Sequence, residues 1–487
     1  MIFKKKQNLI KKIVQHNNFK LFIAGALSAL AFAPLYLFPL LFLSFFYLLI
    51  SIEEKKLSKK QTFLKGWFFG FGHFVIGLYW ICGSLLIEPL KYAWLVPFAL
   101  ILIPGAAAVY IGLVTLSLNT IKEKFKIKDK FYIVLIFAII WVIFEFLRTK
   151  LVSGFPWNLI GYVWCFSDIM IQTAFIFKIY GLSFLAIFIF SAFYVFTKKE
   201  KKNFKFIKLD KTYKSYLAIY ILVFLGVIFY GYFQLSNKKE VKLNSTFRLV
   251  QPSIEQKFKL NSGEKVNIIL KHLELSKINN DKVDYIIWPE SAIPFILQEN
   301  STLVVELSKS LQNKILITGG LRGQIKNNQI QKIWNSLFAI QNSTITDFYD
   351  KHHLVPFGEY IPFSQFLPSF IKNMTYGNLD FSRGQKDTII SVNNLKIKPL
   401  ICYEIIFPAL AKSKQDYDLI VNITNDAWFG NTSGPYQHLD AAKLRAVENR
   451  KPVLRVANSG ITVVINPHGQ IIDKIKLNKK GYLDIEL

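Results

Sequence analysis

The chain has 487 residues, of which 52% are hydrophobic and 16% aromatic, and its formal net charge is +28. One soluble core does not use such an apolar share, and the excess lies before about residue 235. We therefore expect two domains in different solvents, a membrane domain over residues 1–235 and a second domain over residues 236–487. The positive charge would suit nucleic acid, but the sequence has no RNA- or DNA-binding motif, so we expect no nucleic-acid partner.

Seven apolar runs in the first domain are candidates for membrane spans, because a helix needs roughly 20 residues to cross the hydrocarbon. Pro34 separates the first two runs, which predicts a tight helical hairpin, and the second run is short for a span. The candidate spans are residues 14–33, 35–50, 66–87, 92–118, 131–148, 179–197 and 216–235.

Lysine is concentrated in every second connection between these runs. The lysine-rich segments are residues 4–12, 55–65, 122–130 and 198–214. The connections between them, around Pro34 and at residues 88–91 and 149–176, are poor in Lys and Arg. Cytoplasmic loops carry the excess of Lys and Arg, so we expect the N-terminus to be cytoplasmic. Seven spans then place the second domain, residues 236–487, outside the cytoplasm.

The connection at residues 149–168 is rich in aromatic residues and contains Gly-Phe-Pro-Trp at 154–157. Trp and Tyr favour the membrane–water interface, so an anchoring or packing role would explain them. A second hypothesis is that Pro156 and Trp157 bind lipid, as a lipid-facing wall beside an active site. Glu145 and Arg148 precede this connection and could pair one helical turn apart.

After about residue 245 the pattern changes to short β-branched runs separated by turns and helical stretches, which predicts an α/β domain. The expected strands are residues 246–251, 285–289, 315–318, 336–340, 345–349, 397–402, 419–423, 453–457 and 462–465, and the expected helices are residues 264–277, 303–312 and 436–449.

Three residues that could carry chemistry stand where expected strands end: Glu290, Lys351 and Cys402. Taken singly, each has a plainer explanation, as a core thiol or a solvated charge. Together they fit one mechanism, because sites in α/β folds assemble at the carboxyl ends of strands and a thiolate needs a base and a nearby cation. Glu290 could serve as general base, and Lys351 could supply the charge and stabilise an oxyanion. The alternative base is one of three histidines, at His352, His353 and His438.

The sequence around these residues resembles the three signature blocks of the nitrilase, or carbon–nitrogen hydrolase, superfamily. The blocks read Ile-Trp-Pro-Glu-Ser-Ala-Ile-Pro at 287–294, Asp-Lys-His-His-Leu-Val-Pro-Phe-Gly-Glu at 350–359 and Ile-Cys-Tyr-Glu-Ile-Ile-Phe-Pro at 401–408. With seven upstream spans, Gly-Phe-Pro-Trp at 154–157 and the segments at 425–430 and 445–450, the whole chain is similar to the apolipoprotein N-acyltransferase family.

This resemblance implies a role for each matching residue. The family's general base falls on Glu290, its essential lysine on Lys351 and its nucleophile on Cys402. Supporting carboxylates fall on Glu359 and Glu404, for which a structural salt bridge is an equal explanation, and an orienting role falls on Tyr403.

The resemblance also implies a polytopic α-helical membrane bundle joined to an α-β-β-α sandwich on the outer side of a bacterial cytoplasmic membrane. Cys402 would take an acyl chain from a phospholipid as a thioester, and the amine of a diacylglyceryl-cysteine in an apolipoprotein would accept it. No metal or organic cofactor is expected, because the thiolate carries the acyl group. Members of the family typically end in an eighth span, whereas this sequence stops at residues 481–487 without an apolar tail.

Two other functions remain open from the sequence. A membrane-tethered amidase or nitrilase would use the same three residues on a small amide, although it would not need a seven-span bundle. A membrane scaffold or transporter with an inactive nitrilase-like domain is the other, although the presence of Glu290, Lys351 and Cys402 together argues against it.

Overall fold

The computed structural model of the protein describes residues 17–53, 57–151, 154–200, 203–238, 241–259, 261–298, 301–326, 329–362 and 380–487. The chain divides into two compact units, Met1–Asn237 and Lys238–Leu487. The lysine-rich segment 4–12, which the topology prediction uses, lies outside the described residues.

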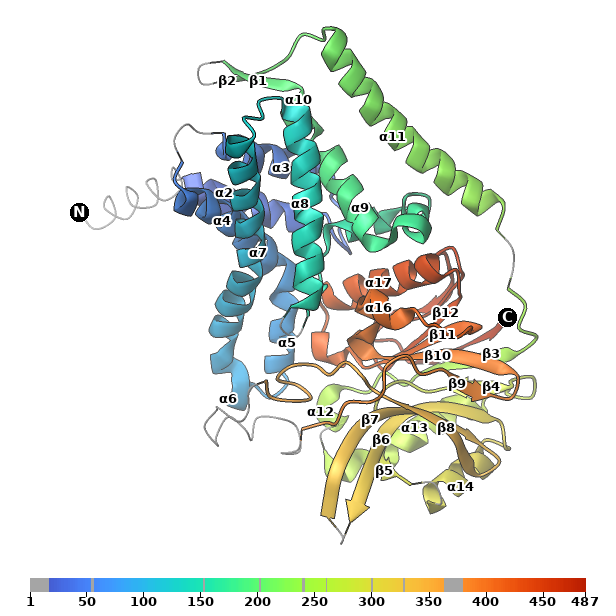
Figure 1. The fold of residues 1–487 in the computed structure, drawn as a ribbon. Helices are drawn as coiled ribbons and strands as arrows, with labels where there is room; N and C mark the ends of the chain where they lie inside the picture. Colours follow the sequence, from blue (N-terminus) through green and yellow to red (C-terminus); the bar gives the residue numbers. More distant parts are fainter. Residues whose placement is uncertain are drawn as a thin grey trace. The chain divides into compact units, whose positions relative to one another are not determined.

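The first unit is helical (Figure 1). Among the described residues, five helical segments are long and apolar enough to cross a membrane: Lys59–Leu85, Pro89–Lys124, Lys130–Lys150, Met170–Val195 and Lys211–Ser236. The first two expected spans contain shorter helices in the part of the chain that the structure describes, α2 (Asn17–Ala29) and α3 (Leu40–Ser51). Besides short 3-10 helices, the other described elements are α4 (Lys59–Leu78), α5 (Cys82–Leu85), α6 (Pro89–Tyr92), α7 (Val96–Lys124), α8 (Lys130–Lys150), α9 (Ala174–Phe190), α10 (Ala192–Val195), α11 (Lys211–Ser236) and the hairpin β1 (Thr197–Glu200) and β2 (Asn203–Phe206).

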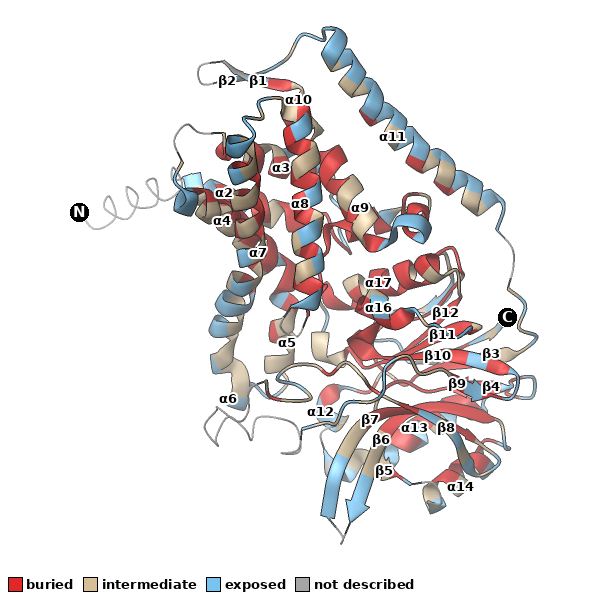
Figure 2. Cartoon of the chain, viewed as in Figure 1, coloured by how far each residue is buried: buried red, intermediate tan, exposed pale blue. Residues whose placement is uncertain are grey.

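Helices of this unit pack through small residues and turn large apolar side chains outward. Helix α4 packs against α2 and α7. At the α2–α4 crossing, a Cβ atom on Gly25 would lie 1.8 Å from the Phe69 carbonyl oxygen, so only glycine allows this approach. Along α11, by contrast, Leu222 is 68% exposed and Phe229 is 74% exposed, and most of the helix is pale blue or tan in Figure 2. A long helix with apolar side chains on most of its exposed surface is typical of a membrane span.

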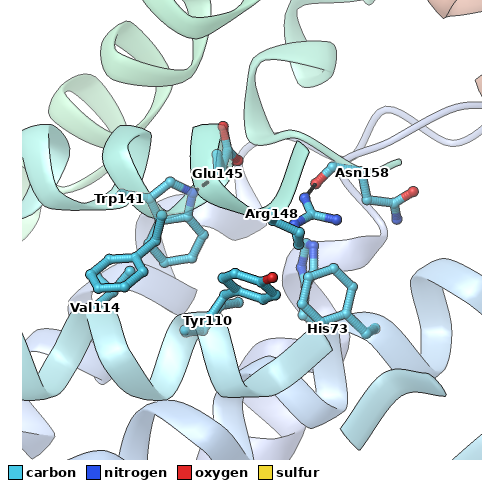
Figure 3. Close-up of a pocket in the computed structure, with 10 residues that line it drawn as sticks. His73, Tyr110, Val114, Trp141, Glu145, Arg148 and Asn158 are labelled. Atoms are coloured by element: carbon cyan, nitrogen blue, oxygen red, sulfur yellow. Dashed lines mark hydrogen bonds between the residues drawn. The ribbon is translucent and has the colours of Figure 1, made fainter. Parts of the chain in front are cut away.

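The charged residues at the end of α8 bind the connection that follows it (Figure 3). Arg148 donates from Nη1 to the carbonyl oxygens of Phe155 at 3.0 Å and Trp157 at 2.7 Å. Glu145 accepts the backbone N–H of Ile160 at 2.7 Å. Both line a small pocket with His73, Tyr110, Trp141 and Asn158. Glu145 and Arg148 were expected to pair with each other. Their hydrogen bonds in the structure go to the backbone of residues 155–160 and hold this connection against α8.

The second unit contains a seven-stranded sheet. Strands β3, β4 and β6 run parallel, and β15, β7 and β8 pair antiparallel at the two sides. In sheet order the strands are β15 (Gly481–Glu486), β3 (Thr246–Gln251), β4 (Tyr285–Ile287), β6 (Ile315–Lys326), β7 (Gln329–Gln341) and β8 (Thr344–Asp350), with β5 (Ile293–Leu297) paired to β6.

A second sheet has six strands, and its centre is parallel. The order is β14 (Ile471–Ile475), β13 (Thr462–Ile465), β12 (Val453–Ala457), β11 (Leu419–Thr424), β10 (Leu395–Ile401) and β9 (Ile390–Val392). Strand β11 is parallel to both β10 and β12, with all six of its residues buried. A strand covered on both faces by protein is expected to read as a continuous apolar run, as most of Leu-Ile-Val-Asn-Ile-Thr does.

The two sheets share one core, and helices cover their outer faces (Figures 1 and 2). Tyr285 and Ile287 of β4 pack with Val421 and Ile423 of β11 between the sheets. Alternate residues of the first sheet pack outward against helices α13 (Lys265–Lys277) and α14 (Thr302–Ser310). Helix α17 (Gly434–Asn449) contacts β12 on the other side. The remaining short helices are α12 (Gln256–Lys259) and α16 (Pro408–Ala411). This order of layers is the α-β-β-α sandwich, so the fold class expected from the sequence is confirmed.

Each of the nine strands expected in this unit is present, and its described residues form four more that were not predicted. Strands β5, β9, β14 and β15 are short or largely exposed, so they lack the buried apolar run that reveals a strand. Strands β6 and β7 also extend past the expected ranges as a hairpin arm whose far residues are exposed, Ile325 and Ile330 among them.

Candidate functional site

The three candidate residues follow strands from both sheets. Lys351 comes directly after β8, and Glu290 lies three residues after β4, in the same sheet. Cys402 comes directly after β10 of the other sheet, at the start of a 3-10 helix, Cys402–Ile406. A Cβ atom on Gly319 of β6 would lie 2.7 Å from the Glu290 Cα, so glycine lets this strand pass close under the Glu290 turn.

Glu290 and Lys351 meet in one buried cluster with a third side chain that the resemblance implied, Glu359. The Lys351 ammonium lies 2.8 Å from Glu359 Oε1 and 3.6 Å from Glu290 Oε1. Asn335 of β7 donates from its amide nitrogen to the same two oxygens, at 2.8 Å to Glu290 and 2.9 Å to Glu359. The Lys351 side chain is 1% exposed. One cation and one amide thus hold two carboxylates in a fixed arrangement.

Sequence reasoning missed Asn335. It belongs to Lys-Ile-Trp-Asn-Ser, which reads as an ordinary strand and gives no sign that its amide joins two buried carboxylates. The backbone carbonyl oxygen of Asn335 also accepts the backbone N–H of Lys351 at 2.8 Å. A second contact that only the fold creates is the backbone N–H of Asn425, which donates to Glu290 Oε2 at 2.9 Å.

Cys402 is held in a strained backbone conformation, with φ 55°, in the left-handed region that non-glycine residues rarely adopt. Burial raises the pKa of its thiol, and the Glu290 carboxylate raises it further, whereas Lys351 and Thr424 lower it. The net shift is upward. The resting side chain is therefore the neutral thiol, and a base must remove its proton as it attacks.

Lys351 remains charged in this setting. Burial by itself would lower the pKa of its ammonium, but Glu359, Glu290 and Cys402 outweigh burial and hold that pKa well above its ordinary value. A fixed positive charge beside a buried thiol stabilises a thiolate or an oxyanion that forms next to it.

Glu404 and Tyr403 support the turn that carries Cys402. Glu404 accepts the backbone N–H groups of His352 and His353, each at 2.9 Å, and of Ile401 at 2.8 Å. Tyr403 donates its hydroxyl to the Leu354 carbonyl oxygen at 2.6 Å. Both side chains therefore tie the strand end bearing Cys402 to the segment that follows Lys351.

The three histidines considered as alternative bases have other partners. His352 Nδ1 lies 2.9 Å from the Gly384 carbonyl oxygen. The ring of His353 lies against Phe407, with centroids 4.0 Å apart. His438 Nδ1 lies 3.0 Å from Asp426 Oδ1, and burial followed by the charge of Arg455 lowers the pKa of His438. Glu290, by contrast, raises the pKa of the Cys402 thiol through its charge, and Lys351 lowers it.

Known proteins match both units. Residues 24–192 match the family model described as the apolipoprotein N-acyltransferase N-terminal domain, and residues 246–487 match the carbon–nitrogen hydrolase family. An apolipoprotein N-acyltransferase of Rickettsia prowazekii is 40% identical over 467 residues, covering 95% of this chain and 90% of the relative. The chain belongs to the apolipoprotein N-acyltransferase family.

More distant relatives carry the same name. The apolipoprotein N-acyltransferase of Rickettsia typhi is 39% identical, covering 95% of this chain and 90% of the relative. That of Allorhizobium ampelinum is 36% identical, covering 94% of this chain and 87% of the relative. The family resemblance read from the sequence is thus confirmed. This member of the apolipoprotein N-acyltransferase family is an acyltransferase and a multi-pass membrane protein.

Pro156 and Trp157 are buried in the first unit of this apolipoprotein N-acyltransferase family member. Trp157 is 3% exposed, and its ring lies against Trp80, with centroids 4.3 Å apart, and parallel to Phe155 at 6.1 Å. Its carbonyl oxygen is one of those bound by Arg148. These contacts account for Trp157 as a packing residue, and a lipid contact would require movement of the connection.

Proposed function

We propose that the protein transfers a fatty acyl chain from a membrane phospholipid to the N-terminal amine of diacylglyceryl-cysteine in apolipoproteins, through a thioester on Cys402. The observation that carries this proposal is the buried cluster of Lys351, Glu290 and Glu359 beside a strained cysteine. That cluster can deprotonate a thiol and stabilise an oxyanion without a further group.

In the first step the thiol loses its proton to Glu290 as the sulfur attacks the ester carbonyl of the phospholipid. A tetrahedral oxyanion forms, and the Lys351 ammonium stabilises it. The oxyanion collapses with loss of the alkoxide of a lysophospholipid, which takes the proton back from Glu290. The product is an acyl thioester on Cys402.

In the second step the amine of the acceptor attacks the thioester carbonyl, and the Cys402 sulfur leaves. An amide bond forms, the thioester bond breaks, and a proton from the amine returns to the sulfur through Glu290. Because the energy of the ester is kept in the thioester, the reaction needs no other source of activation.

Intact-mass measurement of the protein after incubation with phospholipid alone tests this proposal. We expect one acyl adduct, located on Cys402 by peptide mapping. Addition of a diacylglyceryl-cysteine peptide should remove the adduct and give the N-acylated peptide. A membrane-tethered amidase would instead release free fatty acid to water and would hydrolyse a small amide. Absence of any adduct, with turnover intact, would rule out the thioester route.

We further propose that the second unit lies outside the cytoplasm, on the periplasmic side of the inner membrane, as the alternating lysine-rich connections indicate. Lys205 and Lys480 are both exposed, so a cysteine at either position should be open to a water-soluble reagent. A membrane-impermeant thiol reagent added to intact spheroplasts is expected to label Lys480→Cys and to spare Lys205→Cys until the membrane is opened. Labelling of both variants from one side would contradict the seven-span topology.

A further inference from the structure

A buried ion pair lies on the α17 side of the six-stranded sheet. Arg455 of β12 donates from Nη2 to Asp426 Oδ2 at 2.6 Å, and both side chains are fully buried. From Nη1, the same guanidinium donates to the side-chain oxygen of Asn422 on β11. His438 of α17 faces the other oxygen of Asp426. Removing two charges from water is costly even when they pair, so stability by itself is a poor explanation for them.

The residues that Arg455 holds are attached to both parts of the proposed catalytic set. Asn422 donates from its side-chain amide to the carbonyl oxygen of Cys402 at 3.2 Å. Three residues later, the backbone N–H of Asn425 donates to Glu290 Oε2. Segment 422–426 thus contacts a nucleophile from one sheet and a base from the other.

Strand register explains why this segment reaches Cys402. Ile401 pairs with Ile423 across the parallel β10–β11 ladder, so Cys402 and Thr424 come next, side by side. The Thr424 hydroxyl donates to Asp426 Oδ1 at 2.9 Å. Across the next ladder Asn422 pairs with Arg455, which places the guanidinium against the Asn422 amide.

We propose that Arg455 is a positioning residue for acyl transfer: by binding Asn422 and Asp426 together, it fixes the segment that holds the Cys402 carbonyl and the Glu290 carboxylate. The inference rests on the proposed function, in which these two residues are the nucleophile and its base. Arg455 touches neither substrate nor reacting atom in this role. A shift of about 1 Å between reacting groups is sufficient to slow a reaction by on the order of 10²-fold.

The charges around Cys402 give this proposal a readout besides turnover. Glu290 and Asp426 raise the pKa of the thiol, and Lys351 lowers it. Arg455 pairs with Asp426. Without Arg455, the Asp426 carboxylate beside Cys402 keeps His438 and Thr424 as partners but loses the guanidinium that faces it, so the thiol should ionise at higher pH.

The test is Arg455→Met in a Cys82→Ser/Cys165→Ser background, in which Cys402 is the remaining cysteine. We expect single-turnover acylation from phospholipid to slow by on the order of 10²-fold. The pH profile of Cys402 alkylation should move to higher pH.

Two further variants separate charge from geometry. In Asp426→Asn/Arg455→Met the Asp426 carboxylate is removed together with Arg455, so the alkylation profile should return toward that of the parent. Acylation should stay slow, because Asn422 still lacks its guanidinium partner. Arg455→Lys keeps the charge without the planar fork, so it should restore the alkylation profile better than the rate.

Arg248→Met is the matched control. Arg248 lies on β3, is also fully buried, and pairs with Asp484 of β15. It should lower thermal stability and leave the acylation rate and the alkylation profile of the folded protein unchanged.

The inference would be overturned if Arg455→Met acylated at the parental rate and its pH profile of Cys402 alkylation did not move. If Arg455→Met does not fold, the double variant, which has no unpaired buried charge, decides it by its acylation rate. If Cys402→Ser were active, the proposed function would be wrong. The pH profiles of Cys402 alkylation in the Arg455 variants would still test the role of Arg455.

Discussion

Cys402→Ser is expected to abolish both acyl-adduct formation and turnover, by on the order of 10⁶-fold, as for nucleophiles that act as a unit with their base. Burial and Glu290 already raise the pKa of the Cys402 thiol. A serine hydroxyl is far less acidic, so a carboxylate base such as Glu290 could not generate its alkoxide in the same place. The measurement is intact mass after incubation with phospholipid, together with transfer to a diacylglyceryl-cysteine peptide.

Two comparisons make this result specific. Cys165→Ser changes a buried thiol in the membrane unit and should retain activity. Glu290→Gln keeps the shape of the base and removes its proton affinity, so it should fail before the adduct forms. Substantial turnover in Cys402→Ser would mean that another residue is the nucleophile, and a normal adduct in Glu290→Gln would mean that another group is the base.

Lys351→Met is expected to slow acylation and deacylation together, each by about 10²–10³-fold. The substitution keeps the length of the stem and removes the charge from a side chain that is 1% exposed. Both steps pass through an oxyanion that this charge stabilises. Because Lys351 lowers the pKa of Cys402, its loss should also move thiol alkylation to higher pH. Single-turnover rates and the pH profile of alkylation measure the two effects.

Lys398→Met is a matched control for Lys351→Met. Lys398 lies on β10, the strand that leads to Cys402, and its 4% exposed side chain pairs with Asp387 at 3.3 Å. Its loss should affect stability and leave both acyl-transfer steps intact. Lys351→Arg keeps a charge but spreads it over a planar fork, so it should rescue poorly. Normal acylation and an unmoved thiol profile in Lys351→Met would remove this residue from the catalytic set.

Local patterns in the sequence are sufficient to predict whether each unit lies in lipid or in water, and to predict most of its helices and strands. A long apolar run is stable as a membrane-spanning helix, so five of the seven predicted spans appear as long apolar helices in the described residues, and the first two contain the shorter helices α2 and α3. The parallel strand Leu419–Thr424, covered on both faces, is recognisable for a related reason, as a short run of mostly apolar residues. Glu290, Lys351 and Cys402 could be named because each ends a strand within a recognisable block.

Side-chain partners depend on which strands become neighbours, and no local pattern reports that. Asn335 bridges Glu290 and Glu359 only because β7 lies beside β8 and β6 in one sheet. Arg455 reaches Asp426 only through the register of β11 and β12. Asn335 is 45 positions from Glu290 and 24 positions from Glu359 along the chain. Contacts between such distant residues exist only after the chain has folded.

The burial of Trp157 and the ionisation of Cys402 were also decided by tertiary structure. Trp157 belongs to an aromatic connection of the kind found at membrane interfaces, but its ring packs on Trp80 and is buried. A cysteine beside a lysine suggests a ready thiolate, but burial and the Glu290 carboxylate outweigh Lys351 and keep the thiol neutral. The sequence by itself determined which chemical groups this acyltransferase has. The fold decided their distances and desolvation, and these set which group holds the proton.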